Sequence, residues 1–71
     1  MGLNFAIEIE QEDDGRWIAE VPDLPGVLAY GATERAAIAA AEALALRVLA
    51  DRLDQGEADA ALSITFTLAA A

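Results

Sequence analysis

The segment from Gly15 to Thr33 holds the densest cluster of turn signals in the chain, and it constrains the fold more than any other part. It opens with an Asp-Gly pair between two strand-like runs, which is typical of a β-hairpin. Pro22 and Pro25 each fix their own φ angle, and Gly26 follows them, so a rigid bend is predicted there. The segment ends on Thr33, a residue type that commonly caps a helix. The chain is therefore expected to turn twice and then begin a helix.

The runs around these turns alternate between apolar and polar residues, as half-buried strands do. In the first run, Phe5, Ile7 and Ile9 fall on one face. The predicted strands are 3–10, 16–21, 27–30 and 62–68. The three alanines at 69–71 are predicted to be a frayed end.

Between the third and fourth strands the sequence is rich in alanine and leucine, which are strong helix formers. We expect a helix from Thr33 to about Asp54, with Gly56 as its stop. Two apolar stripes are present: Ile38, Ala41, Ala45, Leu49 and Leu53 in one, and Ala37, Ala40, Leu44 and Val48 in the other. A helix on one sheet needs only one stripe. The second stripe is either alanine tolerated in solvent or a contact with another subunit.

The contact with another subunit would be made by the larger side chains of that second stripe and by the short third strand, which could be an edge strand. The oligomer-interface candidates are Leu44, Val48, Val27 and Leu28.

This order of elements, β-β-β-α-β, predicts a single α+β domain over residues 1–71. Three strands form an antiparallel meander, the fourth lies parallel to the first, and the one long helix packs on one sheet face. Small scaffolds usually need a disulfide, a metal or a partner for stability. The chain has no cysteine and no histidine, so neither a disulfide nor a zinc site is expected. We therefore expect a homo-oligomer (dimer or tetramer), a hetero-complex, or both.

The charge of the chain is strongly negative, with thirteen acidic residues against four arginines and a net charge of −9. Such a surface repels phosphate backbones, so nucleic-acid binding by this chain alone is not expected. It attracts basic proteins, although acidity also keeps an alanine-rich chain in solution. No apolar run approaches the roughly 20 residues of a membrane helix. The first residues have no basic segment of a signal peptide. We expect no membrane association and a cytoplasmic location.

Carboxylates are the only groups in the chain that could carry chemistry, because a nucleophilic triad needs residue types that are missing. Glu8 and Glu10 share the polar face of the first strand, and Asp13 and Asp14 are adjacent in the turn. Such pairs could hold Mg²⁺ with a phosphate substrate. Only Arg16 lies near enough in sequence to hold the phosphate, so a solvated strand face and a turn are the favoured interpretation. We expect no enzymatic activity, no cofactor and no metal.

The stretch Asp14–Thr33 resembles the HicB family of antitoxins, and the resemblance extends over nearly the whole chain. The shared features are a turn glycine, an aromatic strand, the sequence Pro-Asp-Leu-Pro-Gly at 22–26, a short strand, and Gly-Ala-Thr at 31–33 before an alanine-rich helix. Ala36 departs from the family, which commonly has an acid there, so the helix start lacks a capping-box partner.

The resemblance implies a reduced ribonuclease H-like fold and a role as the antitoxin of a type II toxin–antitoxin system. Such an antitoxin covers the active face of a small basic HicA-type toxin, which cleaves mRNA. Many family members also carry a C-terminal DNA-binding domain. This chain ends after its fourth strand, so operon repression by it alone is not expected.

The likeness to ribonuclease H also bears on catalysis, which in that fold needs acids on the first strand, the helix and the fourth strand. Glu8 or Glu10, with Glu42, could stand at the first two places. The fourth strand offers only Ser63, Thr65 and Thr67. A two-metal site would be incomplete, so the resemblance implies a non-catalytic protein.

The residues expected to bind a basic toxin are acids of the first two turns and the second strand, with two aromatic anchors, since aromatic side chains are common interface hot spots. They are Glu12, Asp13, Asp14, Glu20, Asp23, Trp17 and Tyr30. Trp17 shares a strand face with Ala19 and Val21, which favours plain core packing for it. The alternative function is an orphan HicB-like domain, a self-associating scaffold or adaptor with no toxin partner, which the second apolar stripe would serve.

Overall fold

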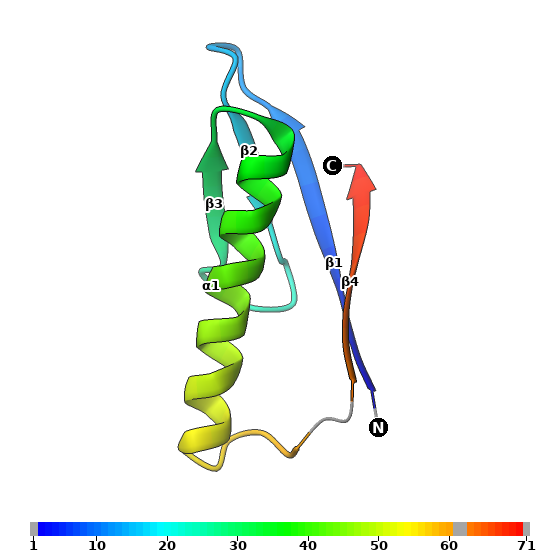
Figure 1. Ribbon diagram of the computed structural model, residues 1–71, viewed down its shortest axis with the longest axis vertical. Coiled ribbons are helices and arrows are strands. Elements are labelled where there is room, and N and C mark those ends of the chain that lie inside the picture. The colour runs from blue at the N-terminus through cyan, green and yellow to red at the C-terminus, as the bar shows by residue number, and fades with distance from the viewer. Residues whose placement is uncertain (1, 61–62, 71) are drawn as a thin grey trace.

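The computed structural model describes residues 2–60 and 63–70 and contains four strands and one helix within them (Figure 1). The elements are β1 (Gly2–Gln11), β2 (Trp17–Glu20), β3 (Leu28–Gly31), α1 (Glu34–Asp54) and β4 (Ser63–Ala70). The sheet order is β3-β2-β1-β4. β1 is antiparallel to β2 and parallel to β4, and β2 is antiparallel to β3. The predicted α+β topology is therefore confirmed.

The end of β4 differs from the prediction. Ala69 and Ala70 were expected to fray, but they pair with Glu8 and Ile9 of β1. The ten-residue β1 is long enough to provide a template for the whole of β4, and backbone pairing with it outweighs the poor strand propensity of alanine. The prediction was wrong for these two residues. The expected strand position of Leu62 and the end at Ala71 fall outside the described residues.

The boundaries of α1 follow local backbone chemistry. Thr33 is the N-cap, and its Oγ1 accepts a hydrogen bond of 3.1 Å from the backbone N–H of Ala36. At the other end, the N–H of Gln55 donates to the Asp51 carbonyl at 2.9 Å. Gly56 then takes a φ of 74°, a left-handed conformation that suits glycine. Both predicted ends of the helix are confirmed.

The core lies between α1 and the face of the sheet that carries Phe5 and Ile7. It consists of Phe5, Ile7, Ala19, Val21, Leu24, Val27, Ala37, Ala41, Ala45 and Leu49. On the helix the buried stripe is Ala37, Ala41, Ala45 and Leu49, spaced four residues apart, so it takes members from both predicted stripes. The helix faces the sheet along a line between those stripes. Leu46 and Leu53 remain exposed.

Gly31, the last residue of β3, lies against the backbone of the first turn of α1. A Cβ atom there would overlap the backbone N of Ala37 and would lie 2.8 Å from the carbonyl carbon of Ala36. Glycine is needed at this place for space, and the close approach that it allows sets the angle at which α1 leaves β3.

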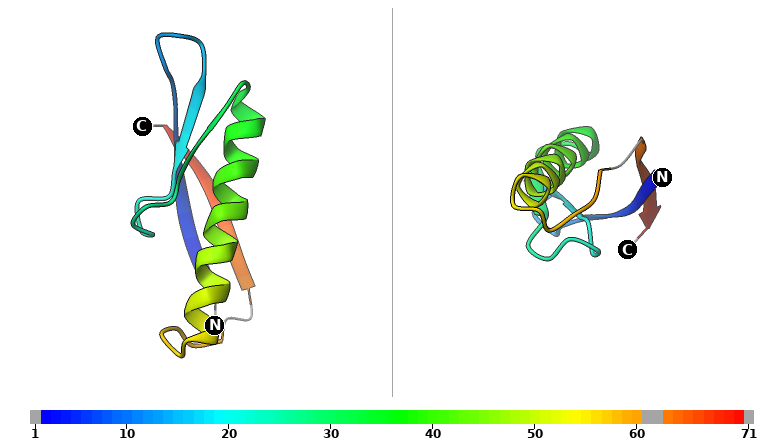
Figure 2. Two further views of the ribbon diagram at one scale, coloured as in Figure 1. Left: turned by 90° about the vertical axis from the view of Figure 1, so that its left-hand side faces the viewer. Right: turned by 90° about the horizontal axis from the view of Figure 1, so that it is seen from below.

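The helix covers only part of the sheet. α1 packs mainly on β3 and β2 and makes fewer contacts with β1. Figure 2 shows α1 alongside β2 and β3, with β4 at the far edge of the sheet. The molecule is elongated, with extents of 40 × 19 × 16 Å. No helix within residues 2–60 and 63–70 is both long enough and apolar enough to cross a membrane.

Candidate functional site

The face of the sheet that points away from α1 carries three carboxylates beside apolar side chains. Since alternate residues of a strand point to opposite faces, Glu8 and Glu10 lie opposite the buried Phe5 and Ile7. The strand register then sets Glu8 against Glu20 and Glu10 against Ile18. We call this surface the open face; its residues are Glu8, Glu10, Ile18, Glu20, Leu28 and Tyr30.

The apolar part of the open face lies at its β3 side. Leu28 pairs with Glu20 and Tyr30 pairs with Ile18. Leu28 is 40% exposed and Tyr30 is 47% exposed. The open face therefore offers negative charge on β1 and β2 and accessible apolar area on β3, a combination that suits a protein partner.

The charges of the open face conflict with one another in the isolated chain. Glu8 and Glu20 stand directly across from each other on neighbouring strands, and like charges in such a pair are destabilising. In the part of the chain that the structure describes, the one ion pair joins Arg16 to Asp14, so neither glutamate has a cationic partner there. A cost of this kind, kept at one place in an otherwise consistent fold, is typical of a functional surface.

Glu20→Gln is therefore expected to stabilise the isolated protein, by about 0.5 kcal/mol, because it removes one of two opposed charges. Urea denaturation measures the change. Glu57→Gln serves as the control, since Glu57 is an exposed acid in the loop after α1 and is not part of the sheet. If Glu20→Gln leaves the free energy of unfolding unchanged or lowers it, while the control leaves it unchanged, then Glu8 and Glu20 do not repel each other measurably in the folded protein.

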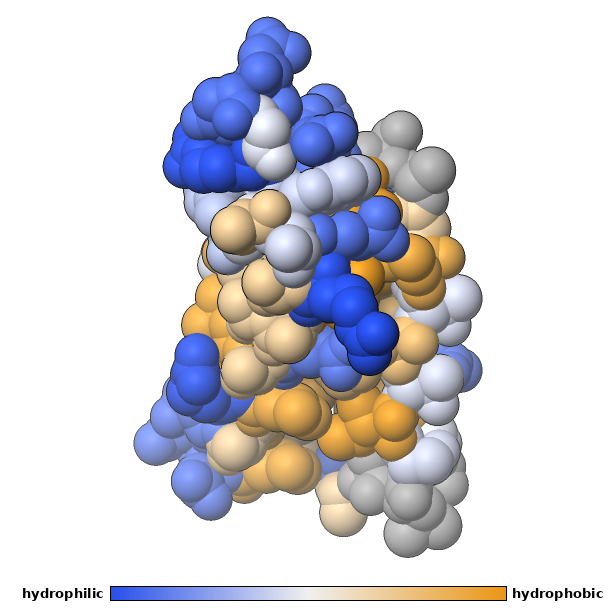
Figure 3. Space-filling model, turned by 45° about the horizontal axis from the view of Figure 1, so that its top comes forward, coloured by the Kyte–Doolittle hydropathy of each residue, from blue (hydrophilic) through white to orange (hydrophobic). Residues whose placement is uncertain are grey.

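The hairpin turn beside the open face is acidic and held by several hydrogen bonds. The N–H of Glu12 donates to the Arg16 carbonyl at 2.7 Å, and the N–H of Gly15 donates to the Glu12 carbonyl at 2.9 Å. Gly15 has a φ of 92°, so the predicted Asp-Gly hairpin is confirmed. Figure 3 shows hydrophilic residues gathered at this end of the molecule. The exposed carboxylates of Asp13 and Asp14 extend the negative charge of the open face beyond the sheet.

Arg16 links the turn to the open face. Its Nε donates to Asp14 Oδ2 at 2.8 Å, and its backbone N–H donates to Asp14 Oδ1 at 3.0 Å. The guanidinium carbon lies 4.7 Å from the centre of the Tyr30 ring, within the range of a cation–π contact. Tyr30 is thus held in place from the turn, which limits the entropy that it would lose on binding.

The Asp14 carboxyl is expected to titrate below its ordinary value. The backbone N–H of Arg16, and next its side chain, lower the pKa of Asp14 from 3.8. A depressed pKa in the folded state means that this stabilisation is present above pH 3.8 and is lost as the pH falls through the folded pKa. NMR titration of the side-chain carboxyl measures the midpoint.

Arg16→Ala is the matched variant for that titration. It should raise the Asp14 pKa only part of the way, because the backbone donor at residue 16 remains. A wild-type midpoint at or above 3.8 would contradict the geometry of this turn.

The structure separates two of the predicted partner-binding residues from the others. Trp17 lies on the α1 side of the sheet, half-buried against the core. Asp23 lies in the bend after β2, at the opposite end of that strand from the hairpin turn. Glu20 and Tyr30 share the open face, and Glu12, Asp13 and Asp14 adjoin it.

Sequence reasoning did not assign Glu8, Glu10 and Ile18 to the binding surface. Glu8 and Glu10 were weighed only as metal or nuclease ligands. The signal that could have found them is the strand alternation, which sets Glu8 and Glu10 on one face of β1. Once the hairpin register is known, that face continues on to Glu20.

Most of the predicted oligomer-interface residues pack in or against the core of the single chain. Val27 is buried in the core, and Leu44 and Val48 are half-buried against it. Leu28 is exposed, but on the open face. On α1, the large apolar side chains that remain accessible are those of Leu46 and Leu53.

The carboxylates weighed for nuclease chemistry are not brought together. Glu8 and Glu10 lie on the open face, whereas Glu42 belongs to α1 on the other side of the sheet. The polar residues of β4 lie on the open-face side of the sheet, since Thr65 pairs with Asn4 and Thr67 with Ala6; they are Ser63, Thr65 and Thr67. Across residues 2–60 and 63–70, no three acidic side chains are grouped closely enough to hold a metal ion.

Comparisons of the chain with protein-family models, with curated proteins and with solved structures gave no match.

Proposed function

We propose that this chain is a non-catalytic binding module whose open face and acidic hairpin turn bind a basic protein. The observation that carries the proposal is the opposed pair of Glu8 and Glu20, which has no ion-pair partner among the described residues and adjoins the exposed Leu28 and Tyr30. Lysine or arginine side chains of a partner would relieve the repulsion between the carboxylates. Burial of the two apolar side chains would add affinity.

The partner class that fits best is a small basic ribonuclease of the HicA type, which makes the chain a HicB-like antitoxin. This more specific proposal is supported by the sequence pattern of Asp14–Thr33, by the net charge of −9 and by the β-β-β-α-β order. The chain would act in the cytoplasm by covering the surface with which the toxin binds mRNA. Because that surface must itself attract phosphates, an acidic cover competes directly with the substrate. No direct contact of this chain with nucleic acid is proposed.

The alternative proposal is an orphan HicB-like scaffold or adaptor that associates with itself and has no toxin partner. Its support is the exposed apolar area of α1 and β4, which lies away from the open face.

Co-expression with a HicA-type toxin from the neighbouring gene tests the proposed function. Growth of the cells should be restored, and the two proteins should co-purify at low salt and separate more readily at high salt. A neighbouring gene for a basic toxin that is neither neutralised nor bound would contradict the antitoxin role. The absence of any such gene, together with stable self-association, would favour the scaffold instead.

A further inference from the structure

The α1 side of the sheet is left exposed at its β4 edge. Four strands spaced about 4.8 Å apart form a surface nearly twice as wide as one helix, which is about 10 Å across with its side chains. α1 packs mainly on β3 and β2, and Phe5 and Ile7 of β1 are buried in the core beneath it. On β4, Ile64 is 39% exposed and Leu68 is 51% exposed. Both lie on the α1 side, because they flank Phe66, whose ring centre is 5.9 Å from that of the buried Phe5.

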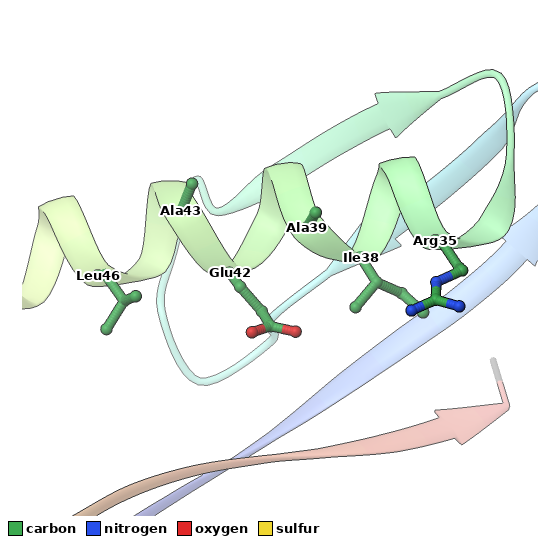
Figure 4. A pocket seen from close by; sticks show the side chains of 6 residues that line it. All are labelled: Arg35, Ile38, Ala39, Glu42, Ala43 and Leu46. Carbon is green, nitrogen blue, oxygen red and sulfur yellow. The ribbon is translucent and has the colours of Figure 1, made fainter.

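The side of α1 next to this edge carries four apolar and two charged residues, which line an open groove of about 510 Å³. The lining residues are Arg35, Ile38, Ala39, Glu42, Ala43 and Leu46. In Figure 4 the side chains of Arg35, Ile38, Glu42 and Leu46 extend from the side of the helix where β1 and β4 run. Figure 3 shows apolar residues over the neighbouring surface. All the lining residues of the groove therefore belong to α1, on the side of the helix where β1 and β4 run.

The groove has one positive and one negative side chain, and their spacing would let two copies of α1 pair them reciprocally. Arg35 and Glu42 are seven residues apart, about 10 Å along the helix axis. Among the described residues neither of them has an ion-pair partner. If a second α1 lies antiparallel beside the first, Arg35 of each copy meets Glu42 of the other. A twofold interface requires this reciprocity, in which residue i contacts j and j contacts i.

The groove side of α1 also carries two small residues. Beyond the stripe that faces the sheet, Ala39 and Ala43 offer small side chains that allow another helix to approach closely. In the isolated chain α1 is covered by a sheet on one side only.

We infer that a second copy of this chain docks in the groove, so that two antiparallel α1 helices lie side by side between two sheets. Each helix then covers the β4 edge of the other copy's sheet, where Ile64 and Leu68 are exposed. The groove has no net charge, although the chain has a net charge of −9, so two copies can meet there without direct repulsion between carboxylates. For the same reason the groove has little attraction for a basic protein. The open face lies on the other side of the sheet, and it stays accessible in this dimer.

A charge exchange at Arg35 and Glu42 tests the arrangement, read out as mass by light scattering at concentrations up to about 100 µM. The wild-type chain should be a dimer. Arg35→Glu and Glu42→Arg should each weaken the dimer by about tenfold or more, because each turns two attractive pairs into repulsive ones. The double variant R35E/E42R should restore the dimer.

Arg47→Glu is the matched control, because it changes the net charge as much as Arg35→Glu does but lies outside the groove; it should leave the dimer intact. Circular dichroism checks that every variant is folded. A wild-type monomer throughout the concentration range overturns the inference. Failure of R35E/E42R to restore the dimer, with the single variants monomeric, overturns the antiparallel pairing. Neither result bears on toxin binding, which rests on the open face.

Discussion

Gly31→Ala is expected to lower the free energy of unfolding by about 3 kcal/mol, a large part of the roughly 5 kcal/mol that a small domain has. The added methyl group would overlap the backbone of Ala36 and Ala37 in the first turn of α1. Backbone cannot rotate out of the way as a side chain can, so the helix would have to move away from β3. That movement would open the contact of α1 with the sheet, on which the core depends.

The control for this substitution is Gly56→Ala. Gly56 has a φ of 74° but open space around its Cβ position, so alanine there should cost only about 1 kcal/mol of backbone strain. Urea denaturation of the two variants separates the two effects. Equal losses of stability at the two positions would contradict the close approach at Gly31.

Leu24→Ala should destabilise the protein by about 3 kcal/mol, although Leu24 lies in a loop. Its side chain is buried with Val21 and Val27. Its N–H donates to the Val21 carbonyl, and its carbonyl accepts from the N–H of Val27, both at 3.0 Å. The proline-rich bend therefore folds back and inserts Leu24 into the core. Truncation would leave a cavity at one end of a core that is already thin.

Asp23→Ala, in the same bend, is the control for Leu24→Ala. Asp23 is exposed, so its removal should change the free energy of unfolding by less than about 0.5 kcal/mol. Thermal or urea unfolding distinguishes the two variants. If both have small effects, the bend is a surface loop and does not contribute to the core.

The strands and both ends of the helix could be predicted because local chemistry determines them. Period-two alternation identified β1 and β4, and Thr33 and Gly56 marked the ends of α1. The rotation of α1 about its axis could not be predicted. Alanine is compatible with both burial and exposure, so a helix with two alanine-rich stripes does not show which of them faces the sheet. Only the packing revealed that Ala37, Ala41 and Ala45 are buried together.

The composition of the open face depends on which residues of neighbouring strands pair with each other. This strand register is harder to predict from sequence than the strands themselves. The conflict between Glu8 and Glu20 exists only because the hairpin pairs these two residues. A shift of one residue in that pairing would have separated them and turned one strand over. Trp17 and Tyr30 were both candidate anchors for a partner, although strand alternation favoured core packing for Trp17. β2 directs Trp17 toward the core, and β3 directs Tyr30 to the open face.

The most direct test of the binding proposal is the affinity for a HicA-type toxin, measured by titration calorimetry for the wild type and for the triple variant E8Q/E10Q/E20Q. These substitutions leave the core intact and remove the charge of the open face. We expect a loss of affinity of about a hundredfold at low salt and less at high salt, with no loss of stability in the free protein. Unchanged affinity in the triple variant would contradict the assignment of the open face as the binding surface.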